Sequence, residues 1–197
     1  MKKILVTLLA VIMVFAMCSC SSKADDGLEI ANPVTECSYD EMFSKTGIEI
    51  KAPENAEDVA YAYIEMENAD PIGQVEFTVE GKRYCYRAQP TAATSIMNSI
   101  GDDGFYMAED ILDALNEGVN VGATLSGLNY EWKASATIDI GYCEGIAAFN
   151  EGAAGFVSWL DVVPGILYSL GMDDGCSQDI LMTMAEDIFV PVQGNAE

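Results

Sequence analysis

Residues 128–140, LNYEWKASATIDI, alternate without a break between apolar and polar side chains. Every even position is apolar, including Trp132 and Ile140, and every odd position is polar or charged. Successive side chains of a β-strand point to opposite faces, so this period of two predicts a long strand. The strand is expected to have one buried face and one face in water, which is typical of an antiparallel sheet.

A second segment, residues 75–88, predicts a β-hairpin. Glu80 and Gly81 can form a two-residue turn between alternating segments. The turn sets a register that pairs Val75 with Tyr86, Phe77 with Tyr84 and Val79 with Lys82. One face of this hairpin is apolar, so a core is expected on that side. The apolar face carries Val75, Phe77, Tyr84 and Tyr86, and the other face carries Glu76, Thr78, Arg83, Cys85 and Arg87.

Capping residues and periodicity predict the remaining elements. Ser38 and Glu41 form a capping box before a short helix that Gly47 ends. Ser177 begins a closing helix, and apolar residues at helical spacing predict two more helices within residues 91–118. Further strands are expected at residues 48–50, 59–66, 146–149, 156–161 and 166–170, where 59–66 fits a strand better than a helix.

Together these elements predict a single α+β domain over residues 36–193. Its centre is a twisted antiparallel β-sheet of about six to eight strands with helices packed on one face. The helices include an inserted segment near residues 91–118 and a C-terminal helix. The apolar stripe of that insertion is typical of core packing, and the alternative is a lid or a face that binds a partner.

The N-terminus has the pattern of an export signal. Two lysines precede residues 4–17, which contain one polar residue, Thr7. Fourteen residues are too few to span a hydrocarbon core of about 30 Å, so residues 1–19 are interpreted as a lipoprotein signal peptide. Cys20 follows the small Ser19 and is the expected lipidation site; an ordinary cleaved signal is the alternative. Residues 20–35 then form a lipidated cysteine and a flexible acidic tether.

The charge of the chain excludes several classes of partner. Nine basic and 32 acidic residues give a net charge of −23. A nucleic acid is excluded, because phosphate binding requires clustered lysines and arginines. An anionic membrane surface would also repel the protein body. The main role expected for the acidic surface is solubility, and cation binding is the alternative. Together with the export signal, we expect a protein that is exported and anchored by its lipid to the outer face of the bacterial cytoplasmic membrane.

The sequence contains no recognisable catalytic motif, and it has no histidine. The absence of histidine removes the commonest general base and most zinc sites. Adjacent carboxylates occur at residues 109–110, 173–174 and 186–187, but adjacency alone does not separate two pKa values as acid–base catalysis requires. The segments at 102–104 and 173–175 lack the spacing of a calcium loop. No catalytic residue, metal or cofactor is therefore assigned.

Four cysteines follow Cys20 and have no CxxC spacing. An even number in an exported chain permits two disulfides, although one disulfide or four buried thiols fit the sequence equally well. These cysteines are Cys37, Cys85, Cys143 and Cys176.

Aromatic and basic side chains on the expected strands give two candidate binding features. Arg83 and Arg87 share a hairpin face with Glu76, which favours ion pairing across the strands, with a carboxylate-binding strip as the alternative. Strand aromatics normally fill a core, but they are numerous enough here to line a ligand groove. The candidate groove residues are Tyr84, Tyr86, Trp132, Trp159 and Tyr168.

From residue 36 onward the chain resembles a family of uncharacterised lipoproteins and envelope proteins of Gram-positive bacteria. The resemblance implies a tryptophan strand, a tyrosine strand and a final helix that complete the domain, and a segment 91–118 longer than the usual connection. It implies no catalytic residues. The matching segments are QVEFTVEG (74–81), YCYR (84–87), SGLNYEW (126–132), SWLD (158–161), PGILYSL (164–170) and the closing helix.

These observations favour a lipid-anchored, non-catalytic module of the cell envelope that binds a small-molecule ligand or a protein. One alternative is a carboxylate- or metal-dependent envelope hydrolase. Another is a regulatory or structural subunit of a membrane complex. Two carboxylates that face each other across a pocket would favour the hydrolase, whereas an aromatic groove without them would favour binding.

Overall fold

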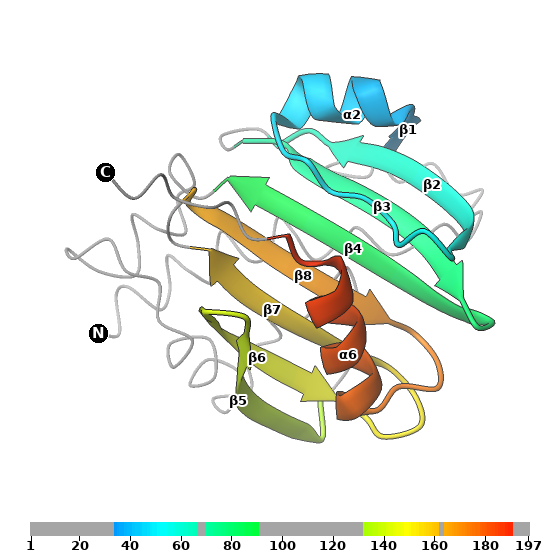
Figure 1. Cartoon of the computed structure of the whole chain (residues 1–197), viewed down its shortest axis with the longest axis vertical. Coiled ribbons are helices and arrows are strands. Elements are labelled where there is room, and N and C mark those ends of the chain that lie inside the picture. The colour runs from blue at the N-terminus through cyan, green and yellow to red at the C-terminus, as the bar shows by residue number, and fades with distance from the viewer. Residues whose placement is uncertain (1–33, 67–69, 91–131, 162–163, 191–197) are drawn as a thin grey trace, which may run out of the picture.

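The computed structural model describes residues 34–66, 70–90, 132–161 and 164–190. Within these ranges the chain forms one open sheet of eight strands, in the order β1-β2-β3-β4-β8-β7-β6-β5, and two helices (Figure 1). Every neighbouring pair of strands is antiparallel. The elements are β1 (Val34–Cys37), α2 (Tyr39–Thr46), β2 (Glu57–Ile64), β3 (Ile72–Val79), β4 (Lys82–Pro90), β5 (Ala134–Ile140), β6 (Cys143–Phe149), β7 (Gly155–Asp161), β8 (Ile166–Met172) and α6 (Gln178–Ile188).

The antiparallel sheet of eight strands and the C-terminal helix confirm these two parts of the predicted fold, and the described residues are mostly sheet with few helices. The helices expected within residues 91–118 lie outside the described residues, as do the expected signal peptide and the expected lipidation site Cys20. Strand β1 was not predicted. The strand predicted at residues 48–50 is wrong, since the chain has no strand there and instead buries Ile48 and Ile50 in the core.

The hairpin β3–β4 has the predicted register. Val75 is opposite Tyr86, Phe77 is opposite Tyr84, and Val79 is opposite Lys82. The turn residues Glu80 and Gly81 have φ angles of 53° and 73°. Both angles lie in the left-handed region that a two-residue hairpin turn requires, and glycine reaches it without steric cost.

Strand β5 is shorter than its sequence pattern predicts. The strand begins at Ala134, and residues 128–131 lie outside the described ranges. Its alternation is confirmed near its end, where Ile138 and Ile140 are buried and Asp139 is exposed. Trp132 precedes the strand, so the strand's alternation does not set the direction of its side chain.

Both helices begin as the capping residues predict. The Ser38 side chain accepts a hydrogen bond from the Glu41 amide, and the Ser177 side chain accepts one from the Ile180 amide. Gly47 ends α2 with φ 69°. Helix α2 contacts β2 and β3, and α6 contacts β5, β7 and β8. Met42 of α2 and Leu181 of α6 belong to one buried cluster with the sheet.

The strand register gives the two faces of the sheet different characters. We call the side that carries Tyr86 the aromatic face; its rows are Val75–Tyr86–Leu170–Val157, Phe77–Tyr84–Met172–Gly155 and Gly73–Ala88–Tyr168–Trp159. The opposite side carries the row Gln74–Arg87–Ser169–Ser158, and we call it the polar-row face.

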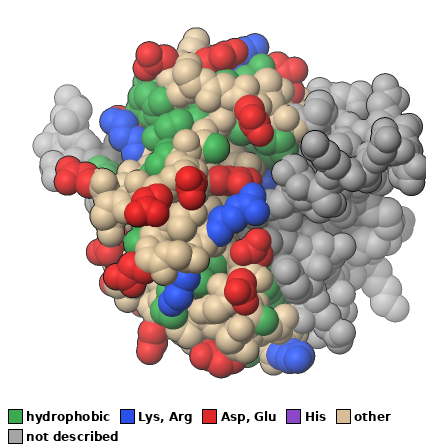
Figure 2. Space-filling model, turned by 90° about the vertical axis from the view of Figure 1, so that its right-hand side faces the viewer, with side chains coloured by type: hydrophobic (Ala, Val, Ile, Leu, Met, Phe, Trp, Pro, Cys, Tyr) green, Lys and Arg blue, Asp and Glu red, His purple; other side chains and the backbone are tan. Residues whose placement is uncertain are grey.

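The described surface is strongly acidic, as the composition predicts. Figure 2 shows Asp and Glu side chains spread over one side of the molecule with few Lys and Arg side chains among them. In the part of the chain that the structure describes, neither helix has the length and apolar character needed to cross a bilayer.

Candidate functional site

A pocket of about 400 Å³ opens beside the aromatic face. This volume is within the usual range for small-molecule sites. The end of α2, the segment after it, the end of α6 and two central strands all contribute to the wall. The lining residues are Phe43, Gly47, Ile48, Glu49, Lys51, Tyr86, Ile166, Tyr168, Ile188 and Val190.

Helix ends bring distant parts of the sequence together at this pocket. Gly47 adopts the left-handed conformation that stops α2, and the chain then turns to place Ile48 against the core. At the other wall, Ile188 is the last residue of α6. Tyr86 and Tyr168 come from the neighbouring central strands β4 and β8.

The inner wall of the pocket is part of an aromatic stack. The rings of Trp159 and Tyr168 are stacked with centroids 5.5 Å apart, and Tyr86 lies 6.0 Å from each of them. The Phe189 ring meets Trp159 and Tyr168 edge-on at 5.6 and 5.5 Å. Offset and edge-on contacts of this kind add stability beyond the burial of area. The packed rings therefore form a continuous aromatic wall.

The two tyrosine hydroxyls supply the polar character of this inner wall. Neither Tyr86 nor Tyr168 makes a hydrogen bond with another described residue. Burial raises the pKa of Tyr86 well above its usual value, and the neighbouring Tyr168 adds to this effect. Burial, with a contribution from the Asp161 carboxylate, raises the pKa of Tyr168 to about 12. Both hydroxyls stay protonated at neutral pH and can donate and accept a hydrogen bond.

The mouth of the pocket is partly charged and partly apolar. Lys51 forms an ion pair with Glu49 and lies 5.1 Å from the centroid of the Tyr39 ring. The hydrogen bond and charge of Lys51 lower the pKa of Glu49, so this carboxylate is ionised at neutral pH. Phe43 and Val190 leave large exposed apolar surfaces at the rim, with 45% and 79% of each residue accessible.

The structure brings together three of the five predicted groove residues. Tyr86, Trp159 and Tyr168 form the stack behind the pocket. Tyr84 does not line the pocket and stacks on Phe77 instead, with centroids 5.4 Å apart. Trp132 does not line the pocket either. Its ring packs edge-on against Phe156 of the polar-row face at 5.3 Å.

Sequence reasoning missed the apolar walls of the pocket, which come from both helices, from the segment after α2 and from β8. Phe43, Ile48, Ile166 and Ile188 belong to four separate segments, so no local pattern joins them. The left-handed residue Gly47 was the one available signal, because it predicts a sharp change of direction after α2.

The structure holds the four described cysteines, Cys37, Cys85, Cys143 and Cys176, as thiols. Cys37 is partly buried and the other three are buried. Burial and the Asp161 charge raise the pKa of Cys143 to about 12, and burial and Glu151 raise the pKa of Cys176 to about 12. Burial and Glu41 also raise the pKa of Cys37. These thiols are protonated at neutral pH and therefore poor nucleophiles.

Of the adjacent carboxylates considered in the sequence, those at residues 173–174 and 186–187 do not line the pocket, and those at 109–110 lie outside the described residues. Asp173 is partly exposed and lies 3.9 Å from the Arg83 guanidinium. Asp161, which was not predicted as notable, is fully buried on the aromatic face and accepts a hydrogen bond of 2.9 Å from the Tyr142 hydroxyl. Among the described residues, no group of three or more acidic or cysteine side chains is arranged to hold a metal ion.

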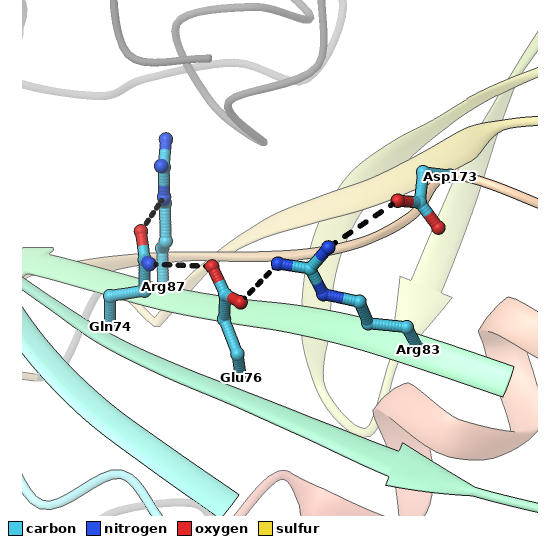
Figure 3. Close-up of polar contacts among 5 residues, drawn as sticks. All are labelled: Gln74, Glu76, Arg83, Arg87 and Asp173. Atoms are coloured by element: carbon cyan, nitrogen blue, oxygen red, sulfur yellow. Dashed lines mark hydrogen bonds and ion pairs between the residues drawn. The ribbon is translucent and has the colours of Figure 1, made fainter. Parts of the chain in front are cut away.

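The predicted cross-strand ion pairing is confirmed for one of the two arginines. Arg83 forms ion pairs with Glu76 and Asp173, whereas Arg87 donates from Nε to the side-chain oxygen of Gln74 at 2.8 Å (Figure 3).

Comparisons of the chain with models of protein families, with curated proteins and with solved structures find no match in any of the three.

Proposed function

We propose that this chain is a lipid-anchored, extracytoplasmic binding protein without catalytic activity, related to the envelope lipoproteins that its sequence resembles. The pocket would take a small ligand with an apolar body and one hydrogen-bonding group. The observation that carries this proposal is the juxtaposition of apolar walls with the hydroxyls of Tyr86 and Tyr168, which no described residue engages. Binding sites of this kind combine a mostly apolar lining with a few convergent polar groups.

The position of the pocket follows if both helices lie on the aromatic face. Two glycines of that face support this inference. A Cβ atom at Gly73 would lie 3.6 Å from the Met42 sulfur of α2, and one at Gly155 would lie 3.0 Å from Leu181 of α6. Helices on the same face leave a gap between their ends, and the pocket is lined by the end of each.

The carboxylates at the pocket support binding over hydrolysis. Among the described residues of the lining, Glu49 is the only acidic one, and it is exposed and paired with Lys51. Acid–base hydrolysis would require a second carboxyl group with a separated pKa facing it. The binding proposal needs only the apolar walls and the two phenols.

Binding of the neutral probe N-phenyl-1-naphthylamine tests the pocket. Its aromatic rings match the apolar walls, and its single N–H can donate to a tyrosine oxygen, so saturable binding with increased probe fluorescence is expected. One of the two variants Tyr86→Phe and Tyr168→Phe should weaken binding by about 2- to 10-fold, the usual net value of one neutral hydrogen bond, because the single N–H can donate to one hydroxyl at a time. Fluorescence titration gives the dissociation constants.

Tyr84→Phe is the matched control, because Tyr84 is a buried tyrosine of the same strand that does not line the pocket. This variant should bind the probe as the unaltered protein does. Absence of saturable binding, or equal effects of all three substitutions, would argue against the pocket as a ligand site.

The lipid anchor is tested by exchange of the two cysteines near the signal cleavage zone. In Cys20→Ser we expect loss of metabolic labelling with palmitate and release of the protein from the membrane fraction into the medium, because the acyl attachment atom is gone. Cys18→Ser should keep both the label and the membrane location. If the unaltered protein and both variants were unlabelled and released into the medium, the signal would be an ordinary cleaved one.

A further inference from the structure

The polar-row face has an unusual centre. Gln74, Arg87, Ser169 and Ser158 come from β3, β4, β8 and β7, and they are directly opposite one another across the sheet. All four are buried, with exposed fractions of 2–5%. Buried polar side chains normally have hydrogen-bonding partners, and buried charges are normally paired.

Arg87 has little of its hydrogen-bonding capacity in use. Its Nε donates to Gln74, and the Gln74 amide nitrogen donates to Glu76 at 3.0 Å. Glu76 in turn is paired with Arg83, so this carboxylate is already engaged (Figure 3). Within the described ranges no carboxylate forms an ion pair with Arg87. Figure 3 shows its two terminal nitrogens directed away from Gln74 and from the sheet.

An arginine in this state is unfavourable. Its guanidinium remains charged at all relevant pH values, and a largely buried charge destabilises a fold unless a partner compensates it. The chain has 32 acidic residues for nine basic ones, so carboxylates are abundant, and yet the described part of the sheet places none on this guanidinium. The unused donors are best explained by a negatively charged group that is not part of the described sheet.

We propose that Arg87 binds the carboxylate of a small molecule with an apolar body. The terminal nitrogens of a guanidinium present a planar fork that matches a carboxylate in bidentate geometry. A single arginine in a chain of net charge −23 suits a monoanion better than a phosphate dianion. The side chains around the row on the same face are apolar, among them the buried Phe156, Leu160 and Leu167, so a ligand bound to Arg87 would lie in apolar surroundings.

This site is independent of the pocket in the proposed function. Arg87 and Tyr86 are neighbours in β4, so their side chains point to opposite faces of the sheet. A ligand on the polar-row face therefore cannot contact the tyrosine hydroxyls that the first proposal uses.

Thermal unfolding with benzoate tests the proposal, with benzamide as the neutral isostere. The full chain is expressed with its signal, and the exported protein is purified in detergent and held at constant ionic strength. At a benzoate concentration a hundredfold above its dissociation constant, we expect the Tm to rise by about 5–10 °C. Benzamide should give no comparable rise.

Arg87→Met should abolish the benzoate shift, and Arg87→Lys should weaken benzoate binding at least tenfold, because lysine keeps the charge but lacks the fork. Lys82→Met is the control from the same strand, because it removes one positive charge outside the Gln74–Glu76–Arg83 network, and it should keep the shift. Neither Arg87 variant should alter binding of N-phenyl-1-naphthylamine, which separates this proposal from the pocket.

Equal shifts with benzoate and benzamide, or a benzoate shift that persists in Arg87→Met or Arg87→Lys, would overturn the proposal. No benzoate shift in the unaltered protein would also overturn it. A strongly lowered Tm of Arg87→Met without ligand, together with no benzoate shift in the unaltered protein, would indicate a purely structural role for the guanidinium and would likewise overturn the proposal.

Discussion

Trp159→Ala is expected to lower the free energy of unfolding by about 3–5 kcal/mol, the usual range for truncating a buried tryptophan. Trp159 is 1% exposed and lies on the central strand β7. Its ring stacks on Tyr86 and Tyr168 and meets Phe189 edge-on. Alanine would remove all three ring contacts and leave a cavity behind the pocket wall. Denaturant unfolding followed by circular dichroism measures the loss.

Trp159→Phe is the matched comparison, since phenylalanine keeps an aromatic ring in the stack. We expect its loss of stability to be less than half that of Trp159→Ala. Because Trp159 supports the pocket-lining tyrosines, the alanine variant should also bind N-phenyl-1-naphthylamine more weakly. A loss below about 1 kcal/mol in Trp159→Ala would show that the stack does not hold the centre of the sheet.

The second large effect is expected at Gly145 of β6. A Cβ atom at this position would overlap the carbonyl oxygen of Ser158 and lie 3.0 Å from the Trp159 Cβ. The obstructing group is backbone of the paired strand β7, so it cannot move aside as a flexible side chain would. Gly145→Ala should therefore lower the free energy of unfolding by about 3 kcal/mol, at the upper end of the usual range for overpacking.

Glu144→Ala is the control for the Gly145 variant, because the exposed neighbour Glu144 points to solvent. Glu144→Ala should change the free energy of unfolding by no more than about 0.5 kcal/mol. Urea unfolding of both variants measures the difference. If the two substitutions had similar effects, close approach of β6 and β7 would not be the reason for a glycine at this position.

Local chemistry made much of the sheet predictable. The register of β3 and β4 follows from Glu80 and Gly81, because a two-residue turn leaves one pairing that keeps the apolar side chains on one face. The start of α6 follows from the Ser177 cap. In each case the residues that decide the structure are adjacent in sequence.

Other features depend on contacts between distant segments and were not predictable. Alternation continues through Trp132, but its ring packs against Phe156, and β5 begins two residues later. The pocket joins the end of α2 to the end of α6 across about 140 residues of chain. The identity of Arg87 suggested an ion pair, and only the paired register shows that Arg83 takes the available Glu76.

The strand order has a consequence for how the chain folds. Strands β1 to β4 and strands β5 to β8 each run as a local meander, and the two meanders meet only where β4 pairs with β8. Contacts within each meander close short loops, whereas the β4–β8 seam joins residues 82–90 to residues 166–172 and must close a long one. Loop-closure entropy makes such long-range pairing slow. We therefore expect the seam to form last, which makes the meeting of two preformed halves the rate-limiting event.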